Sequence, residues 1–308
     1  MFERVIGQKK AKQILSSAVR KDCLSHAYLF TGIHGIGKTT MAKELAMVLN
    51  CETKKGCGEC SSCRRIKQEI YPDVRIIRPD GPTIKIDEIR SLCDFIAMSS
   101  YEGRVKVGII CRAEKMREEA ANSLLKTLEE PPKDSLLILT AENQYAVLPT
   151  IISRVQKIDC QRLETDEIVD YLQKEGQSPS DALKLAEYSG GSLGKALELR
   201  DSQEMQEIFQ NVNLVIERLN QLKSHEIIEI SAKMGKDRLL AFKFLEILSD
   251  VLRTKSFQKD FSTVFGKQYS VTQLALVLEF IEELKLYIEG YGNAQLALES
   301  LFIRICRL

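Results

Sequence analysis

The chain has 308 residues, of which 44% are hydrophobic and 28% are charged, and its formal net charge is +1. This balance is typical of a soluble globular protein of two or three domains, and it excludes an acidic disordered chain and a protein that coats nucleic acid by charge alone. No apolar run is long enough to span a membrane and the N-terminal segment has no signal-peptide core. We therefore expect a cytoplasmic protein without a membrane partner.

The first 160 residues alternate short apolar runs with segments of helical period. The apolar runs predict five strands, at residues 27–30, 74–77, 105–111, 136–140 and 155–158. Helical periods lie between them, at residues 38–49, 87–96 and 118–128. Because strands separated by helices imply crossover connections, we expect an α/β domain with a mostly parallel sheet over residues 1–160.

After residue 160 the strand signals weaken and the pattern becomes helical. Three short helices are predicted at residues 164–174, 180–188 and 192–199, with glycine and proline between them. Longer helices are predicted near residues 204–222, 239–254, 271–289 and 294–307. The predicted helix at 271–289 contains an apolar stripe that fits either an internal core or a partner surface, formed by Leu274, Val277, Leu278, Ile281 and Leu284.

A glycine-rich segment at residues 32–39 reads GIHGIGKT and matches the pattern G-x-x-x-x-G-K-[ST] in full. It follows a predicted strand and opens a predicted helix, where glycines let backbone N–H groups surround an anion and the helix N-terminus adds positive charge. Lys38 is expected to reach the β- and γ-phosphates, and Thr39 to hold Mg²⁺. A chance glycine-rich turn is the alternative. The candidate residues for binding ATP or ADP with Mg²⁺ are Gly32, Gly35, Gly37, Lys38, Thr39 and Thr40.

Hydrolysis of a nucleotide also requires an acidic group at the end of a neighbouring strand, which holds Mg²⁺ and positions water. The predicted strand at 105–111 ends in Cys111 followed by Arg112, where two acids would be expected. Glu114 lies further along, and an acid favoured near a helix start is its simpler interpretation. We therefore predict that the chain holds a nucleotide but is not an active ATPase by itself.

Four of the nine cysteines are clustered with the spacing C-x5-C-x2-C-x2-C, at Cys51, Cys57, Cys60 and Cys63. In a reducing compartment such a cluster indicates a metal site, and four thiolates leave Zn²⁺ no open position. The spacing predicts a structural zinc module at residues 51–63, with an iron–sulfur cluster or no metal as alternatives. The basic residues that follow (Arg64, Arg65 and Lys67) fit a solvated helix face, with contact to a nucleic-acid backbone or a partner as the alternative. The remaining cysteines are expected to be small buried hydrophobes.

Several of these stretches resemble the clamp-loader branch of the AAA+ family, and in particular the subunits of the bacterial DNA polymerase III clamp loader. The stretches that carry the resemblance are VIGQKKAKQIL at 5–15, HAYLFTG at 26–32, AANSLLKTLEEPP at 120–132 and PTIISRV at 149–155. In the last of these, Ser153-Arg154 is similar to a Ser-Arg-Cys motif, with Val155 in place of the cysteine. The resemblance implies an AAA+ core over 1–160 that carries the zinc module, a three-helix lid over 161–200 and an all-α collar over 201–308.

Two subunit types in this family carry zinc modules: the motor (tau/gamma), which hydrolyses ATP, and a stator. The resemblance favours the stator because the chain departs from the motor pattern in three places. It implies a subunit of the polymerase holoenzyme that helps load the sliding clamp onto primed DNA during replication. Arg154 would then be the catalytic residue, an arginine finger acting in trans; a surface arginine in a salt bridge is the simpler interpretation. The three departures are Cys111-Arg112, Thr140-Ala141-Glu142 at the first sensor, and Gly194 in the lid.

The implied partners are the tau/gamma and delta subunits, the sliding clamp, and primer–template DNA contacted within the complex. Two other functions stay open. A catalytically active tau/gamma-like or ring-forming AAA+ ATPase predicts ATP turnover by the chain alone. A zinc-dependent nucleic-acid-binding module predicts tight, salt-sensitive DNA binding by the lone chain, and the near-neutral charge speaks against it.

Overall fold

The computed structural model describes residues 1–257 and 264–308, with side chains at 1–253 and 264–308. These residues form two compact units, Met1–Glu167 and Ile168–Leu308. Within the described part of the chain, no helix has both the length and the apolar character needed to cross a bilayer. The three ranges expected above, divided at residues 160 and 200, remain predictions.

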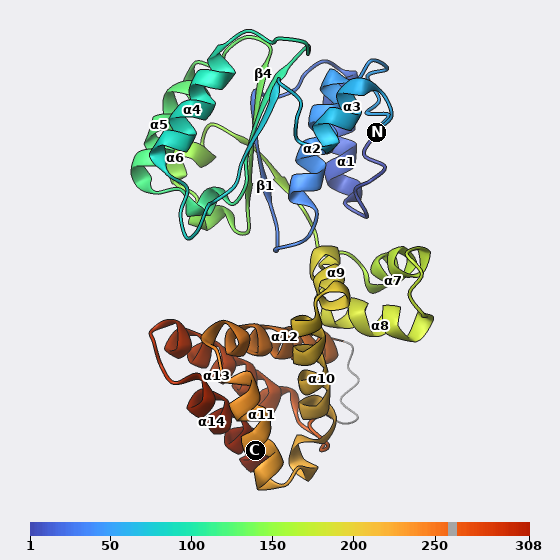
Figure 1. The fold of residues 1–308 in the computed structure, drawn as a ribbon, viewed down its shortest axis with the longest axis vertical. Helices are drawn as coiled ribbons and strands as arrows, with labels where there is room; N and C mark the ends of the chain where they lie inside the picture. Colours follow the sequence, from blue (N-terminus) through green and yellow to red (C-terminus); the bar gives the residue numbers. More distant parts are fainter. Residues whose placement is uncertain (258–263) are drawn as a thin grey trace. The chain divides into compact units, whose positions relative to one another are not determined.

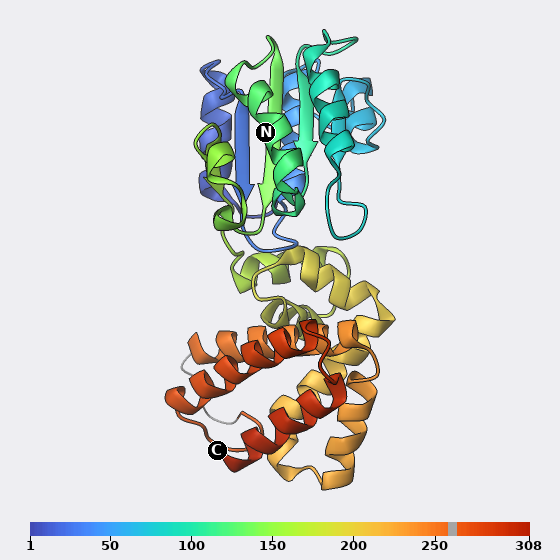
Figure 2. The same ribbon diagram turned by 90° about the vertical axis from the view of Figure 1, so that its left-hand side faces the viewer.

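The N-terminal unit is built on a five-stranded sheet whose strands are all parallel, in the order β2-β3-β4-β1-β5 (Figure 2). This confirms the predicted parallel sheet, and each strand lies within a residue of its expected bounds. Because the strands are parallel, their carboxyl ends meet at one edge, which is where open α/β sheets bind ligands. The strands are β1 (Ala27–Thr31), β2 (Val74–Ile77), β3 (Lys106–Ile110), β4 (Ser135–Ala141) and β5 (Gln156–Asp159).

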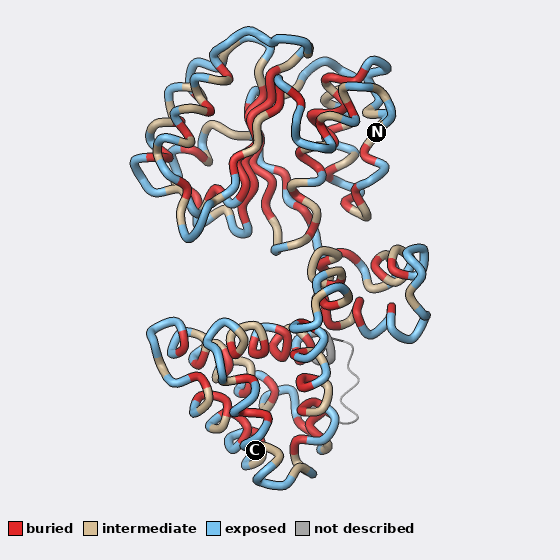
Figure 3. The backbone as a smooth tube through the Cα atoms, in the orientation of Figure 1, coloured by how far each residue is buried: buried red, intermediate tan, exposed pale blue. Residues whose placement is uncertain are grey.

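Helices cover both faces of this sheet (Figure 1). One face carries α1 (Lys9–Arg20), α2 (Lys38–Asn50) and α3 (Ser61–Lys67), and the other carries α4 (Ile86–Ala97), α5 (Glu118–Glu129) and α6 (Pro149–Ile152). The inner strands β1, β3 and β4 are almost entirely buried (Figure 3), as expected for a sheet that is covered on both sides, whereas only Ile158 is buried on the edge strand β5. Short 3₁₀ helices follow two strands, η1 (Ala113–Lys115) after β3 and η2 (Gln144–Ala146) after β4.

The second unit is helical in all of its described residues apart from connecting turns. On α13, Leu274, Val277, Ile281 and Leu284 are buried, and α13 packs against α12 and α14. The apolar stripe predicted from the sequence is therefore an internal core of this unit. The helices are α7 (Thr165–Lys174), which begins in the first unit, α8 (Pro179–Tyr188), α9 (Leu193–Asp201), α10 (Gln203–Arg218), η3 (Leu219–Gln221), α11 (Ser224–Met234), α12 (Arg238–Phe257), α13 (Val271–Glu289) and α14 (Ala294–Arg307).

The scattered cysteines do not all behave as the sequence analysis predicts. Cys111 and Cys160 are buried, and Cys93 and Cys306 are half-buried. Cys23 is exposed, so the prediction that it is a buried hydrophobe is wrong. The reason is local, because Cys23 follows the last turn of α1 in a connection with the polar residues Lys21 and Asp22.

Candidate functional site

The glycine-rich segment connects β1 to α2 at the carboxyl edge of the sheet. Gly35 and Gly37 have φ angles of +71° and +98°, which side chains other than glycine rarely adopt, and Gly37 is the N-cap of α2. At Gly32 a Cβ atom would lie 2.5 Å from the carbonyl oxygen of Cys160. The three glycines therefore let the chain turn tightly and aim the N-terminus of α2 into the loop, as anion binding requires.

Lys38 lies at the centre of this loop. Its Nζ donates hydrogen bonds to the carbonyl oxygens of Gly32 at 2.5 Å and of Ile33 at 2.8 Å. Burial lowers the pKa of Lys38, while the charge of Glu142 acts in the opposite direction. The structure thus brings together the predicted residues from Gly32 to Thr39 around one cationic group, whereas Thr40 faces solvent.

Thr39, the expected magnesium ligand, faces a cysteine. Its Oγ1 lies 3.6 Å from Sγ of Cys111, which directly follows β3. Burial raises the pKa of the Cys111 thiol, so it is neutral at neutral pH. Mg²⁺ prefers oxygen ligands, and a carboxylate at this strand end normally completes its site. The donor set opposite Thr39 therefore does not fit Mg²⁺.

A cluster of charges connects two strand ends to the phosphate loop. Oε1 of Glu142, after β4, lies 3.4 Å from Nη2 of Arg112 and 3.6 Å from Nδ1 of His34. The hydrogen bond from His34 and the guanidinium of Arg112 lower the pKa of Glu142 to about 2. The backbone N–H of Arg112 also donates to Oγ1 of Thr140 at 3.1 Å. Three of these residues belong to the departures noted in the sequence, but their meeting with His34 was not predicted.

Glu114 is another carboxylate near the loop. It lies in η1, and its Oε2 is buried without a hydrogen-bond partner among the described residues. Its charge acts on Lys38 and raises the pKa of that group. Glu114 is thus close enough to influence the phosphate-binding lysine, although no hydrogen bond in the described structure ties it to Thr39.

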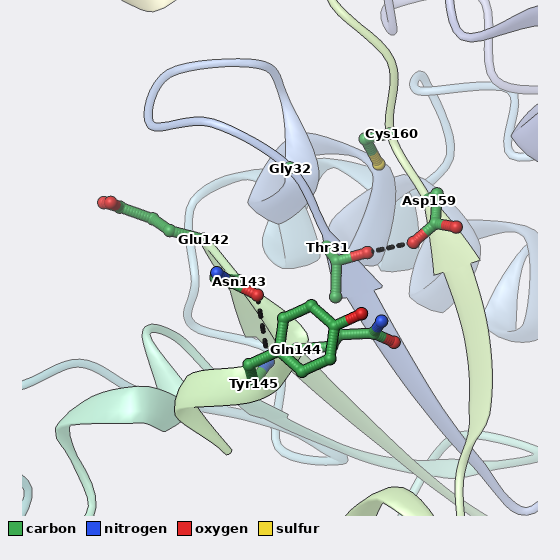
Figure 4. Close-up of a pocket in the computed structure, with 8 residues that line it drawn as sticks. All are labelled: Thr31, Gly32, Glu142, Asn143, Gln144, Tyr145, Asp159 and Cys160. Carbon is green, nitrogen blue, oxygen red and sulfur yellow. Dashed lines mark hydrogen bonds between the residues drawn. The ribbon is translucent and has the colours of Figure 1, made fainter.

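A pocket of about 240 Å³ opens beside Gly32 at the same edge of the sheet (Figure 4). Oγ1 of Thr31 donates a hydrogen bond to Asp159, and the side chain of Asn143 accepts one from the backbone N–H of Tyr145 at 2.9 Å. The Glu142 side chain extends away from Thr31 and Asp159. No pattern in the sequence predicts this pocket. Its lining residues are Thr31, Gly32, Glu142, Asn143, Gln144, Tyr145, Asp159 and Cys160.

The four clustered cysteines converge at the other end of α2. Their sulfur atoms all lie within 4.8 Å of one another, so Cys51, Cys57, Cys60 and Cys63 can close a tetrahedral shell around one metal ion. Burial raises the pKa of the Cys51 thiol, but hydrogen bonds from Thr53 and the Cys57 backbone outweigh it and lower that pKa to about 5. An all-sulfur set of this kind fits Zn²⁺ and leaves no open position for catalysis.

The N-terminal segment packs against this cluster. Arg4 lies against Gly58, where a Cβ atom would come within 1.4 Å of its Nη2. The same guanidinium donates to Oε1 of Glu44 at 2.8 Å, and the Glu44 side chain is only 2% exposed. Arg4 thus connects the turn between the cysteines to α2.

Buried polar side chains hold the neighbouring loop at residues 99–105. Asp73, fully buried, accepts hydrogen bonds from three consecutive backbone N–H groups, Tyr101 to Gly103, at 2.6–2.8 Å. Burial works against these bonds, but together with the charge of Lys106 they hold the pKa of Asp73 below its ordinary value. Oδ1 of Asn50, the last residue of α2, accepts from the next two backbone N–H groups.

The basic residues after the cysteines are only partly free for a nucleic acid. Arg65 is half-buried, forms an ion pair with Glu102 and lies over the ring of Tyr71 at 5.0 Å. Arg64 and Lys67 are exposed. The prediction of a solvated helix face therefore holds for two of the three residues, while Arg65 connects α3 to the loop at 99–105.

Arg154 lies just after α6 with its guanidinium partly exposed. Nη2 donates to Oε1 of Glu129, the last residue of α5, at 2.6 Å. Nη1 donates at 3.0 Å to both the carbonyl oxygen of Thr150 and Oγ of Ser153. The side chains of Arg154 and Glu129 are 35% and 51% exposed, so this ion pair is accessible to a neighbouring molecule.

Comparisons with known proteins agree with this geometry. A family model described as DNA polymerase III, delta subunit, matches residues 7–164. The delta' subunit of DNA polymerase III from Bacillus subtilis (strain 168) is 37% identical over 220 residues, which are 71% of this chain and 67% of that protein. The tau subunit from Escherichia coli (strain K12) is 31% identical over 253 residues, and the chain spans 39% of its length.

Among solved structures, a gamma subunit-related protein of DNA polymerase III from Thermotoga maritima matches with a TM-score of 0.54. The match covers 95% of this chain and 98% of that one at 19% identity, so it shows the fold alone. A phosphate-loop sequence at the edge of a covered parallel sheet, followed by a helical unit, gives this chain an AAA+-like fold. Since the family model covers just over half of the residues, the chain belongs to the delta' family of DNA polymerase III clamp-loader subunits.

Proposed function

We propose that the chain is a delta-prime (stator) subunit of a bacterial replicative clamp loader, working in the cytoplasm with tau/gamma and delta subunits to place the sliding clamp on primed DNA. One observation carries the proposal: Thr39 faces the thiol of Cys111 at 3.6 Å, while the phosphate loop around Lys38 is retained. Such a site can hold ATP or ADP but lacks the carboxylate that positions water for hydrolysis.

Arg154 is the residue through which this subunit acts on a neighbour. An arginine finger stabilises the charge on a transferring phosphoryl group and can be supplied by another chain. The partly exposed Arg154 guanidinium supports this role, because it is held by the exposed carboxylate of Glu129 rather than in the core. The cysteine cluster has a structural role in the proposal, as a zinc site that orders residues 51–63.

The test is a clamp loader reconstituted from this chain, a tau/gamma motor and delta. With Arg154→Ala we expect the DNA-stimulated clamp-loading rate to fall about tenfold or more, since an arginine finger contributes on the order of 10³ or more to turnover at its own site. Arg90→Ala, an exposed arginine of α4, is the matched control and should leave the rate unchanged. Full loading and ATPase rates with Arg154→Ala would refute the role.

A second variant separates the guanidinium from its ion pair. Glu129→Gln removes the charged partner of Arg154 but keeps the arginine. Because partly exposed ion pairs contribute about 1 kcal/mol or less, we expect folding to be unaffected and loading to stay within about twofold of the wild type. A loss equal to that of Arg154→Ala would show that the ion pair, rather than catalysis in trans, is what matters.

The identity to tau subunits favours one other candidate function, an active tau/gamma-like ATPase. It predicts steady ATP turnover by the purified chain alone, abolished by Lys38→Ala. The stator proposal predicts no turnover above background in the same assay.

A further inference from the structure

We propose that the phosphate loop of this chain binds its nucleotide without a divalent metal ion, and that basic side chains supply the charge which Mg²⁺ supplies elsewhere. This inference rests on the proposed function, which places ATP or ADP at the loop. It concerns the form in which the nucleotide is bound, and it follows from the charges around Thr39 and Cys111.

Two basic side chains lie near Cys111. Its backbone N–H donates to the carbonyl oxygen of Ile77 at 2.9 Å. Ile77 ends the neighbouring strand β2, so Arg78 directly follows that strand. Lys43 lies one helical turn after Thr39 on α2, and therefore on the same face of that helix. The charges of Arg78 and Lys43 both reach the Cys111 thiol. The place of the usual metal-binding acid therefore has two cations near it, together with the carboxylate of Glu69, which pairs with both of them.

Two nearby carboxylates are already engaged. Glu69 accepts two hydrogen bonds from Arg78, at 2.6 and 2.7 Å, and pairs with Lys43 as well. Glu142 is shared between Arg112 and His34. A carboxylate that already binds two basic groups must give them up to coordinate a cation, so neither offers Mg²⁺ a ready ligand.

A bound nucleotide would meet charged groups at the loop. Its phosphates would lie at the N-terminus of α2 with Lys38 beside them. Arg112 lies at the end of β3, where its charge acts on Lys38. Arginine retains its charge under all ordinary conditions and matches phosphate oxygens geometrically. Lys38 and Arg112 can neutralise phosphate directly and would oppose an added divalent ion, whereas the charges of Glu142 and Glu114 also act on Lys38 in the opposite sense.

Glu114 could act against this inference, because its buried Oε2 has no hydrogen-bond partner among the described residues. If the carboxylate of Glu114 held Mg²⁺ at the loop, nucleotide binding would depend on the metal. The experiment therefore includes Glu114→Gln.

The test is calorimetric titration of the full chain with ADP, with millimolar Mg²⁺ or in buffer freed of divalent ions on a chelating resin. Resin replaces EDTA because a soluble chelator would remove metal from the cysteine cluster. For the wild type we expect dissociation constants that agree within about twofold. Binding weakened about tenfold or more without Mg²⁺ overturns the inference, and loss of that dependence in Glu114→Gln would then assign the metal ligand to Glu114.

A matched pair of variants tests the role of Cys111 directly. Cys111→Asp introduces a carboxylate opposite Thr39, whereas Cys111→Asn has the same shape without the charge. We expect only Cys111→Asp to gain a dependence on Mg²⁺ of about tenfold. The comparison within the wild type stands even if Cys111→Asp does not fold. If ADP binds in neither condition, the nucleotide part of the proposed function fails together with this inference.

Discussion

Helix α2 connects two sites that differ in which of their expected binding side chains are present. At its C-terminal end the cysteine cluster has four converging sulfur atoms, and Arg4, Asn50 and Asp73 hold the surrounding loops. At its N-terminal end the phosphate loop keeps its glycines and Lys38, but a thiol stands where a metal-binding carboxylate would be expected. One end has four candidate metal ligands, and the other has the candidate anion-binding residues without the expected carboxylate.

The difference shows which kinds of binding survive changes of side chain. Phosphate binding relies on backbone N–H groups and the helix dipole, so it tolerates the replacement of residues nearby. Metal binding depends on a few particular ligand atoms, so the replacement of one acid has a larger effect on it. A structural metal site contributes directly to folding, so it is retained whole or lost whole.

The largest effect expected is at the cysteine end. Cys63→Ser removes one of the four sulfur ligands, and we expect the purified chain to lose its bound zinc and the melting temperature of the N-terminal unit to fall by about 10 °C or more. Elemental analysis and differential scanning calorimetry would measure both. Cys93→Ser, a half-buried cysteine outside the cluster, is the control. A zinc content unchanged in Cys63→Ser would show that the cluster is not the metal site.

The next largest effect is expected at Asp73, which holds the loop at 99–105 near the cysteine end of α2. Asp73→Asn should cost about 2–3 kcal/mol of unfolding free energy at neutral pH, because a buried charged acceptor of three backbone N–H groups is replaced by a neutral one. The pKa of Asp73 is lowered in the folded state, so its stabilisation is present above the ordinary carboxyl pKa of about 3.9 and is lost as the pH falls through the folded value.

Urea denaturation followed by far-UV circular dichroism at neutral and strongly acidic pH would measure this difference. The wild type and Asp73→Asn should converge in stability as the pH falls below about 4. A gap that stays constant with pH would mean that the carboxylate charge of Asp73 does not stabilise the loop at 99–105.

The phosphate end should respond to Lys38. Lys38→Ala removes the cationic group at the centre of the loop, so we expect the affinity for ADP to fall about tenfold or more. The free energy of unfolding should change by no more than about 1 kcal/mol. Calorimetric titration measures the affinity. Lys10→Ala on the exposed side of α1 should bind like the wild type. If Lys38→Ala bound ADP as tightly as the wild type, the loop would not be part of the nucleotide-binding site.

The smallest effect is expected at Glu142. Glu142→Gln removes a partly exposed negative charge beside the loop and releases Arg112, so ADP should bind about two- to threefold more tightly. The same titration would measure this change, and the gain should shrink as salt is added because the group is partly exposed. Weaker binding would indicate that Glu142 supports the loop instead of opposing the anion.

The sequence predicts well what depends on neighbours along the chain. Apolar periodicity is sufficient for the five strands, and the glycine pattern locates the phosphate loop because both signals are local. The cysteine spacing likewise anticipates the convergence of four sulfur atoms. Helix α11 lies in the region after residue 200 that is predicted to be helical, although no separate segment was predicted at its own residues.

Contacts between distant segments could not be read from the sequence. The pairing of Arg154 with Glu129 and of Glu142 with His34 depends on how the ends of strands and helices meet in three dimensions. Nothing in the local pattern distinguishes Arg65, which pairs with Glu102, from its exposed neighbour Arg64. The sequence gives the types of these residues, whereas only the structure gives the residues with which they pair.

The turn at Gly58 has a consequence for Glu44. Even a methyl group at position 58 would occupy the space of the Arg4 guanidinium, so an alanine there would push Arg4 away. Glu44, almost wholly buried, would then lose its counter-ion and would have to take up a proton or unfold its surroundings. A substitution at Gly58, between two cysteines, would thus destabilise the charge of Glu44 inside α2. Glu44 is neither a metal ligand nor a neighbour of Gly58 in the sequence.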